Sequence, residues 1–240
     1  MPILDALKVE NLCIVYRKLL LAAFLTILQG CSQKQEYHVI SASGSMIRPD
    51  GTKDEKAWAD AKEIRSFSNP WNKEVSPETS LSMLRDEKYL YFFFDVSDDE
   101  VVKVPGFQQE RDIEKGDRVE LFFSKDKDMR KYYCFEIDPE GRTLAYAAQH
   151  YRKMDFDWDA PAGFEVAARP RPGGYTVEGA IPLEFLEGLK NGETVFFGAY
   201  RAEFSREDNK LVENWLTWVD PGTASPDFHV PASLGKLIIK

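Results

Sequence analysis

Two tryptophans of the chain stand among polar residues in segments that have the composition of loops. Trp158 lies in DFDWD, residues 155–159, and Trp71 lies in SNPWN, residues 68–72. A sugar ring presents C–H groups on its faces and hydroxyls around its rim, so flat aromatic rings and planar polar side chains suit it. Both tryptophans are candidate platforms for such a ligand, with packing at the edge of a core as the alternative. The other tryptophans fit the core or scaffold better: Trp58, Trp215 and Trp218.

Signatures of catalysis and of a cofactor are sparse. The chain has 3 His residues, none of them spaced as metal ligands, and it lacks both a Gly-x-Ser-x-Gly motif and a phosphate-binding glycine loop. We therefore expect no enzyme activity and no cofactor. Acidic turns at residues 98–100 and 126–128 leave a structural calcium ion open as an alternative to solvated loops, because calcium takes carboxylate ligands from such loops.

The first residues predict export and lipidation. Arg17-Lys18 precedes an uncharged run from Leu19 to Leu28, which is shorter than the roughly 20 residues that span a bilayer. The following segment, LQGC at 28–31, resembles the lipobox of bacterial lipoproteins, in which the cysteine thiol carries a lipid. We expect a signal peptide over residues 1–31 and lipidation at Cys31. The protein would then be extracytoplasmic, anchored to a bacterial outer membrane or cell surface. A plain signal peptide is the alternative.

The composition of the chain restricts the classes of ligand that it is expected to bind. The formal net charge is -9, which disfavours nucleic acid and anionic lipid, because phosphate binding depends on clustered Lys and Arg. Neutral ligands such as sugars remain open. Cys134 is the single cysteine after Cys31, and its neighbours in YYCF predict a buried, inert thiol. The sequence leaves the oligomeric state open.

Short alternating runs separated by turn residues make up most of the chain. YLYFFFDV at 89–96 and RVELFF at 118–123 alternate apolar residues with a period of two, which is typical of strands. Helical patterns are short and cover 54–62 and 183–189. We predict an all-β antiparallel sandwich over residues 46–240, after a tether and first strand at 32–45. Further predicted strands are 132–137, 143–149, 164–168, 175–181, 195–203, 214–218 and 234–239.

Motifs similar to those of family 9 carbohydrate-binding modules follow one another from about residue 46 to residue 240. The matching segments are DG at 50–51, WADA at 58–61, DEKYLY at 86–91, DRVELF at 117–122, YTVEGAIP at 175–182 and HVPASLGKL at 229–237. The chain thus resembles this family, part of the DOMON-like β-sandwich superfamily. The resemblance implies a non-catalytic domain that binds carbohydrate and supports polysaccharide capture or degradation.

The resemblance also implies a set of ligand residues, which this chain matches in part. The family holds a terminal sugar between two tryptophans, whose positions fall here on Glu114 and near Phe228. Its glutamate matches Glu120, and its Arg and Asn positions fall on Glu136 and Asp138. Because the aromatic pair is missing, a sugar would need another platform. The candidate ligand set is Trp158, Glu120, Phe228, Trp71, Arg85 and Asp138. A strand-end ion pair is the alternative for Arg85, and a surface or ion-pair role is the alternative for Glu120.

Three other functions remain as alternatives. A surface interaction or structural protein could have kept the fold without sugar binding. A glycoside hydrolase needs only two carboxylates, and the chain has 40 acidic residues. A haem-binding domain of the same broad fold would use Met83 or Met154 with His150 as axial ligands, whereas a core position is the ordinary role for Met83.

Overall fold

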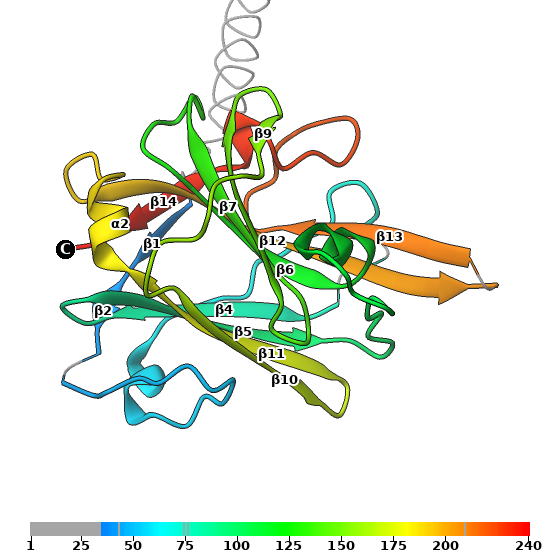
Figure 1. The fold of residues 1–240 in the computed structure, drawn as a ribbon, viewed down its shortest axis with the longest axis horizontal. Coiled ribbons are helices and arrows are strands. Elements are labelled where there is room, and N and C mark those ends of the chain that lie inside the picture. The colour runs from blue at the N-terminus through cyan, green and yellow to red at the C-terminus, as the bar shows by residue number, and fades with distance from the viewer. Residues whose placement is uncertain (1–34, 43, 74, 76, 209) are drawn as a thin grey trace, which may run out of the picture. The chain divides into compact units, whose positions relative to one another are not determined.

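Two packed β-sheets form the body of the protein in the computed structural model, which describes residues 35–240 except 43, 74, 76 and 209 (Figure 1). The predicted signal peptide and Cys31 lie outside the described residues. The all-β sandwich predicted from the sequence is confirmed. Within the described part of the chain, no helix is long and apolar enough to span a membrane.

The first sheet, here called sheet A, has eight strands among the described residues, of which β13 (Lys210–Thr217) pairs with β12. The remaining strands run in the order β1 (Glu36–His38), β14 (Gly235–Ile238), β12 (Thr194–Glu207), β6 (Arg118–Ser124), β7 (Tyr132–Ile137), β8 (Thr143–Gln149) and β9 (Lys153–Asp155). Figure 1 shows the β12–β13 hairpin extending beyond its neighbours.

The second sheet, sheet B, has six strands, of which β3 (Glu63–Ile64) pairs with β4. The others run in the order β10 (Glu165–Arg171), β11 (Gly174–Pro182), β5 (Tyr89–Ser97), β4 (Thr79–Arg85) and β2 (Ile40–Ser41). The helices among the described residues are short: three 3₁₀ segments, η1 (Lys56–Asp60), η2 (Glu110–Lys115) and η3 (Pro231–Ser233), and the α-helix α2 (Leu183–Glu187).

The main core lies between the sheets and follows the alternation of the strands. In β5, Leu90, Phe92 and Phe94 point into it, and Val119, Leu121 and Phe123 of β6 face them from sheet A. The β5 residues between these, Tyr91 and Phe93, point outward and are covered by a second cluster that includes Trp58. Trp218 belongs to the main core. The core assignments of Trp58 and Trp218 are therefore confirmed.

Sheet A is buried on its outer face as well. All seven residues of β6 are buried, because Phe122 and its outward-facing neighbours lie under an aromatic cluster that includes Phe228. Cys134 belongs to this outer cluster and is fully buried, as predicted. The outward-facing polar residues of β6 therefore lie beneath a cover rather than on the surface.

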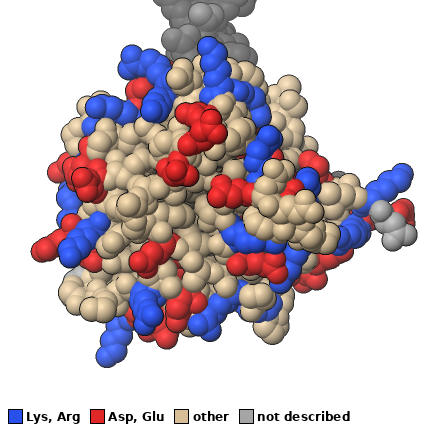
Figure 2. Space-filling model, viewed as in Figure 1, with Lys and Arg blue, Asp and Glu red and all other residues tan. Residues whose placement is uncertain are grey.

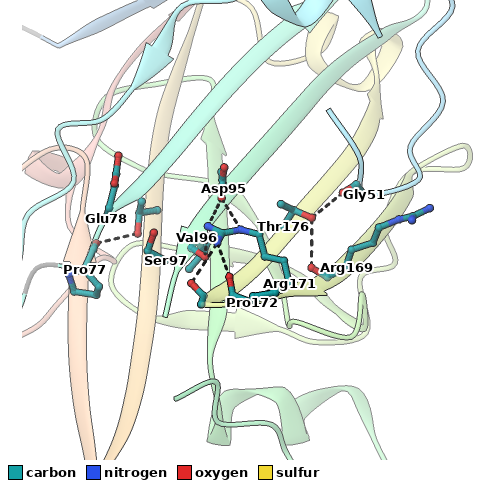
Figure 3. A network of polar contacts seen from close by, with 12 residues as sticks. Gly51, Pro77, Glu78, Asp95, Val96, Ser97, Arg169, Arg171, Pro172 and Thr176 are labelled. Atoms are coloured by element: carbon teal, nitrogen blue, oxygen red, sulfur yellow. Dashed lines mark hydrogen bonds and ion pairs between the residues drawn. The ribbon is translucent and has the colours of Figure 1, made fainter. Parts of the chain in front are cut away.

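A network of polar contacts joins strands β5, β10 and β11 at one end of sheet B (Figure 3). The Nη2 of Arg171 lies 2.5 Å from Oδ1 of Asp95, which ties the end of β10 to β5. The Thr176 hydroxyl donates to the Gly51 carbonyl at 2.7 Å. At Gly174, φ is +145° and a Cβ atom would stand 1.9 Å from the Val96 carbonyl oxygen, so only glycine fits this turn.

Candidate functional site

A cavity of about 250 Å³ lies over the outer face of sheet A, where β6, β7 and β8 run side by side. Its floor consists of outward-facing polar residues of these strands: Arg118, Glu120, Glu136 and Tyr146. Its walls come from β13 and from two loops, and include Trp215, Phe156 and Phe228. The cavity therefore combines buried polar groups with aromatic rings.

Strand pairing brings the floor residues together. Glu120 on β6 stands directly opposite Glu136 on β7, and both are almost fully buried. The Nε of Arg118 donates to Oε2 of Glu136 at 2.6 Å and lies 3.0 Å from Oε1 of Glu120. The Tyr146 hydroxyl donates to the other oxygen of Glu136 at 2.8 Å. One guanidinium thus serves two buried carboxylates.

Glu120 is the incompletely bonded member of this floor. Among the described residues, its Oε1 has no hydrogen-bond partner, since the nearby Arg118 Nε is directed at Glu136. Burial, followed by the charge of Glu136, raises the pKa of Glu120 well above its usual value and so favours its protonated form. A protonated carboxyl group can both donate and accept a hydrogen bond. Such a group facing a cavity can bind a ligand hydroxyl.

The aromatic walls differ in how much ring surface they leave open. Phe228 is buried and stacks on Tyr200, with centroids 4.2 Å apart and planes at 15°. Trp215 is half-buried and lies edge-to-face with Phe228 at 5.8 Å, while its ring covers the Arg118 guanidinium at 5.4 Å. Phe156 is 38% exposed and lies 5.2 Å from Tyr146. Trp215 and Phe156 therefore offer open ring surface.

Side-chain hydrogen bonds to Asp227, together called the clasp, fix the loops at the rim of the cavity. Its carboxylate accepts hydrogen bonds from the Tyr151 hydroxyl at 2.6 Å and from Nη2 of Arg152 at 2.8 Å. Burial would raise the pKa of Asp227, but these bonds outweigh it and lower that pKa. The clasp joins the β8–β9 loop to the segment before η3, which positions Phe228 over the cavity.

His229 lies behind this rim as a neutral side chain. Its Nδ1 shares a hydrogen bond of 2.9 Å with the Tyr132 hydroxyl, and burial lowers its pKa to about 3. His229 therefore contributes shape and a hydrogen bond rather than a charge.

Only some of the predicted ligand residues lie at the cavity. Glu120 and Phe228 line the cavity. Trp71 lies just outside it, with its ring 6.1 Å from Phe228 and its Nε1 donating to the Thr223 carbonyl at 2.9 Å. Trp71 therefore supports the segment that carries Phe228.

The other three candidates lie apart from the cavity. Arg85 belongs to β4 in sheet B, where its guanidinium donates to the Asp86 carbonyl. Asp138 closes the turn after β7 by accepting bonds from Arg142. Trp158 lies at the open edge of the main core, 4.8 Å from the Tyr133 ring.

Several residues of the site were not among the predicted ligand set: Arg118, Glu136, Tyr146, Phe156 and Trp215. Trp215, which the sequence assigned to the core or scaffold, lines the cavity because β13 pairs with β12 and places it beside Arg118. A usable signal existed for Glu136, a lone carboxylate in the apolar strand YYCFEI. A charge in such a strand requires a partner nearby, and Arg118 supplies it.

Metal and haem ligation have little support in the geometry. No group of three or more His, Cys, Asp and Glu side chains within the described residues is arranged to hold a metal ion. In the acidic turns, Asp98 accepts the Glu100 backbone N–H and pairs with the buried Arg201 at 2.8 Å. Met83 is fully buried in the main core, as its ordinary role predicts.

A two-sheet sandwich with aromatic rings over a polar cavity has the architecture of a β-sandwich ligand-binding domain. The sequence profile of the "carbohydrate family 9 binding domain-like" family matches residues 49–240, and the chain belongs to this family. No match was found among curated proteins.

Solved structures share the fold at low sequence identity. One is a Bacteroides uniformis ATCC 8492 protein, named for a proposed carbohydrate-binding role, with 18% identity and a TM-score of 0.67 over 86% of this chain and 99% of that one. Another is a family 9 module from Caldicellulosiruptor kristjanssonii in complex with cellotriose, with 18% identity and a TM-score of 0.58 over 86% and 94%. A family 9 module from C. kristjanssonii in complex with glucose gives 19% identity and a TM-score of 0.55 over 86% and 96%.

Proposed function

We propose that the cavity over β6, β7 and β8 binds a neutral carbohydrate without cleaving it. The observation that carries the proposal is the joined polar floor of Arg118, Glu120 and Glu136 beneath the open rings of Trp215 and Phe156. Sugar hydroxyls match the donors and acceptors of the floor, and the C–H faces of a sugar ring match the aromatic walls.

The charges of the cavity favour a neutral ligand over an acidic one. Four carboxyl groups line it, from Glu114, Glu120, Glu136 and Asp227, against two guanidinium groups. Both guanidinium groups are already paired, Arg118 with Glu136 and Arg152 with Asp227. An anionic sugar would find no free cation there and would be repelled by the carboxylates.

The arrangement of the carboxylates favours binding over hydrolysis. Glycoside hydrolases place two carboxyl groups on either side of the scissile bond. Glu120 and Glu136 instead lie next to each other on neighbouring strands, on one side of any bound ring, and contact the same nitrogen of Arg118. Family membership supports the same conclusion.

A glycan array probed with the full-length protein in detergent tests the proposal, followed by calorimetry with glucose and cellotriose, the sugars bound by the C. kristjanssonii module. We expect binding of at least one neutral glycan and its loss in Glu136→Ala. Folded protein that binds no glycan would contradict the proposal and favour a surface interaction protein that has kept the fold.

We further propose that a lipid on Cys31 anchors this domain to a bacterial membrane, at the outer membrane or cell surface, where it captures polysaccharide. The lipobox-like LQGC at 28–31 supports this anchor. Mass spectrometry of the purified protein should find the lipid on Cys31, and Cys31→Ser should move the protein to the soluble fraction. An unmodified Cys31 in membrane-extracted protein would contradict the anchor.

A further inference from the structure

A second cavity, of about 240 Å³, opens at the edge of the sandwich where β8 faces β10. The short β9 pairs only with Ala147 to Gln149, so among the described strands the opposite end of β8, from Thr143 to Ala145, has no neighbour on that side. Thr143 and Ala145 line the cavity on one side, and Val166 of β10 lines it on the other.

The lining of this second cavity combines an aromatic ring with polar groups. Trp158 is half-buried, with its ring held 4.8 Å from Tyr133 and 6.0 Å from Phe185. Glu110 and Asp159 are exposed, and neither carboxylate forms a hydrogen bond or ion pair with the described residues. A fixed ring beside unengaged carboxylates is the chemistry of a sugar site.

The two cavities are neighbours, because the same segments line both. The helix η2 contributes Glu114 to the first cavity and Glu110, about one turn away, to the second. The segment after β9 contributes Phe156 to the first and Trp158 to the second. The Arg111 guanidinium lies 4.4 Å from the centroid of the Phe156 ring, and this pair, which joins the two shared segments, is here called the Arg111–Phe156 ridge.

The size of each cavity suits a single ring. Both are smaller than the roughly 300–1,000 Å³ of typical small-molecule sites. Figure 2 shows acidic and basic side chains interspersed on the face drawn, without a large region of one sign.

We propose that the second cavity is a further sugar subsite, so that the protein binds a chain of linked neutral sugars. One unit would lie in the first cavity, and the chain would cross the Arg111–Phe156 ridge to the Trp158 ring. This inference rests on the proposed carbohydrate binding. It assigns to Trp158 the platform role, at a subsite separate from Glu120.

Calorimetry with glucose, cellobiose, cellotriose and cellotetraose tests the proposal on the full-length protein; if the array selects another sugar, its own one-to-four-unit series is used. We expect affinity to rise at least tenfold from one unit to three. Asp159→Ala combined with Glu110→Ala should lower the affinity for three units at least fivefold and leave one-unit binding unchanged. Asp157→Ala is the matched control, an exposed carboxylate of the same segment that does not line the cavity.

Trp158 needs separate variants, because its ring also packs on the core. Trp158→Leu keeps an apolar side chain without an aromatic ring and should remove the gain with chain length, and Trp158→Phe should restore part of it. One-unit binding without any gain for longer chains would overturn the second subsite and leave the proposed function intact. A gain that persists in all these variants would also overturn it. Binding of no glycan at all would contradict both proposals together.

Discussion

Glu120 and Glu136 stand directly opposite each other on β6 and β7, nearly excluded from solvent, with a single guanidinium between them. Two buried carboxylates that share one cation carry one negative charge in excess when both are ionised. Burial and the neighbouring charge oppose that ionisation and raise the pKa of Glu120. We therefore expect this pair to affect both the stability of sheet A and the binding of ligands in the cavity.

Removing the shared cation should destabilise the protein strongly. Arg118→Met leaves Glu136 without its charged partner in a buried site, and breaking such a pair costs about 3–5 kcal/mol. Urea unfolding followed by circular dichroism measures the change in the free energy of unfolding. The double variant Arg118→Met/Glu136→Gln removes the orphaned charge and should recover part of the loss. An Arg118→Met protein as stable as the parent would contradict the coupling between these residues.

Sugar affinity should fall as the pH rises through the raised pKa of Glu120. A ring bound over Glu120 removes its remaining water and raises its pKa further, so the ligand binds more tightly to the protonated form. Burial raises the pKa of Tyr146 well above its usual value, which keeps this neighbour un-ionised over the same range. Calorimetry at pH 6, 7, 8 and 9 measures the trend. Glu120→Gln, which stays neutral, should show affinity independent of pH, whereas affinity that increases above pH 8 would contradict the prediction.

Trp215→Ala should weaken sugar binding about tenfold or more, equivalent to about 1.4 kcal/mol, because it removes the open ring of the cavity wall. Trp58→Phe is the control, since Trp58 is buried over the outer face of the other sheet. Calorimetry and a thermal melt of each variant separate lost affinity from lost stability. Equal affinity in Trp215→Ala and the parent would exclude this ring as a platform.

The free energy of unfolding should decrease as the pH rises from about 5 to 8. Glu178 is buried and accepts the Asp50 and Gly51 backbone N–H groups, and burial raises its pKa to about 7. Its pKa is thus higher in the folded than in the unfolded state, so its stabilisation is complete below about pH 4 and is lost as the pH rises through about 7. Urea unfolding at several pH values should show a shallower decline for Glu178→Gln.

The control for this measurement is Glu87→Gln, which changes an exposed carboxylate. Its stability should follow the parent at every pH. If Glu178→Gln also follows the parent, Glu178 is not the titrating group.

The Cys134 thiol should be unreactive in the folded protein. It is fully buried, and burial raises its pKa well above the usual value, which suppresses the reactive thiolate. In a Cys13→Ser/Cys31→Ser protein it is the single cysteine, so a thiol reagent should label it only after urea unfolds the domain. Rapid labelling of native protein would show that the cover over sheet A opens.

The sandwich could be predicted because its central strands carry their pattern locally. The alternation in β5 and β6 specifies two faces without reference to any other part of the chain. The strand β4 was missed because Ser80 and Ser82 interrupt its apolar pattern, yet both serines are buried. Ser82 is covered by Lys53, whose Nζ lies 3.0 Å from its hydroxyl, and that contact joins distant segments.

The β12–β13 hairpin was likewise predicted only in part from its sequence pattern. The prediction ended its strands at 203 and began again at 214, whereas they continue to Glu207 and resume at Lys210. Their polar ends are strands because Ser205 pairs with Val212 and Arg206 with Leu211. Pairing partners compensate for residues whose own preference for strands is weak.

By itself, the sequence determined that the domain is all-β, that Glu120 lies on the face of β6 opposite its core residues, and that Cys134 is buried. Only the tertiary structure decided that the outer face of sheet A is covered, so that Arg118, Glu120 and Glu136 form the floor of a cavity. It also decided that Trp215 lines this cavity while Trp158 lines another. The physical reason is that periodicity along a strand sets the direction of each side chain, whereas what covers that side chain depends on loops distant in the sequence, such as the one that brings Asp227 to Arg152.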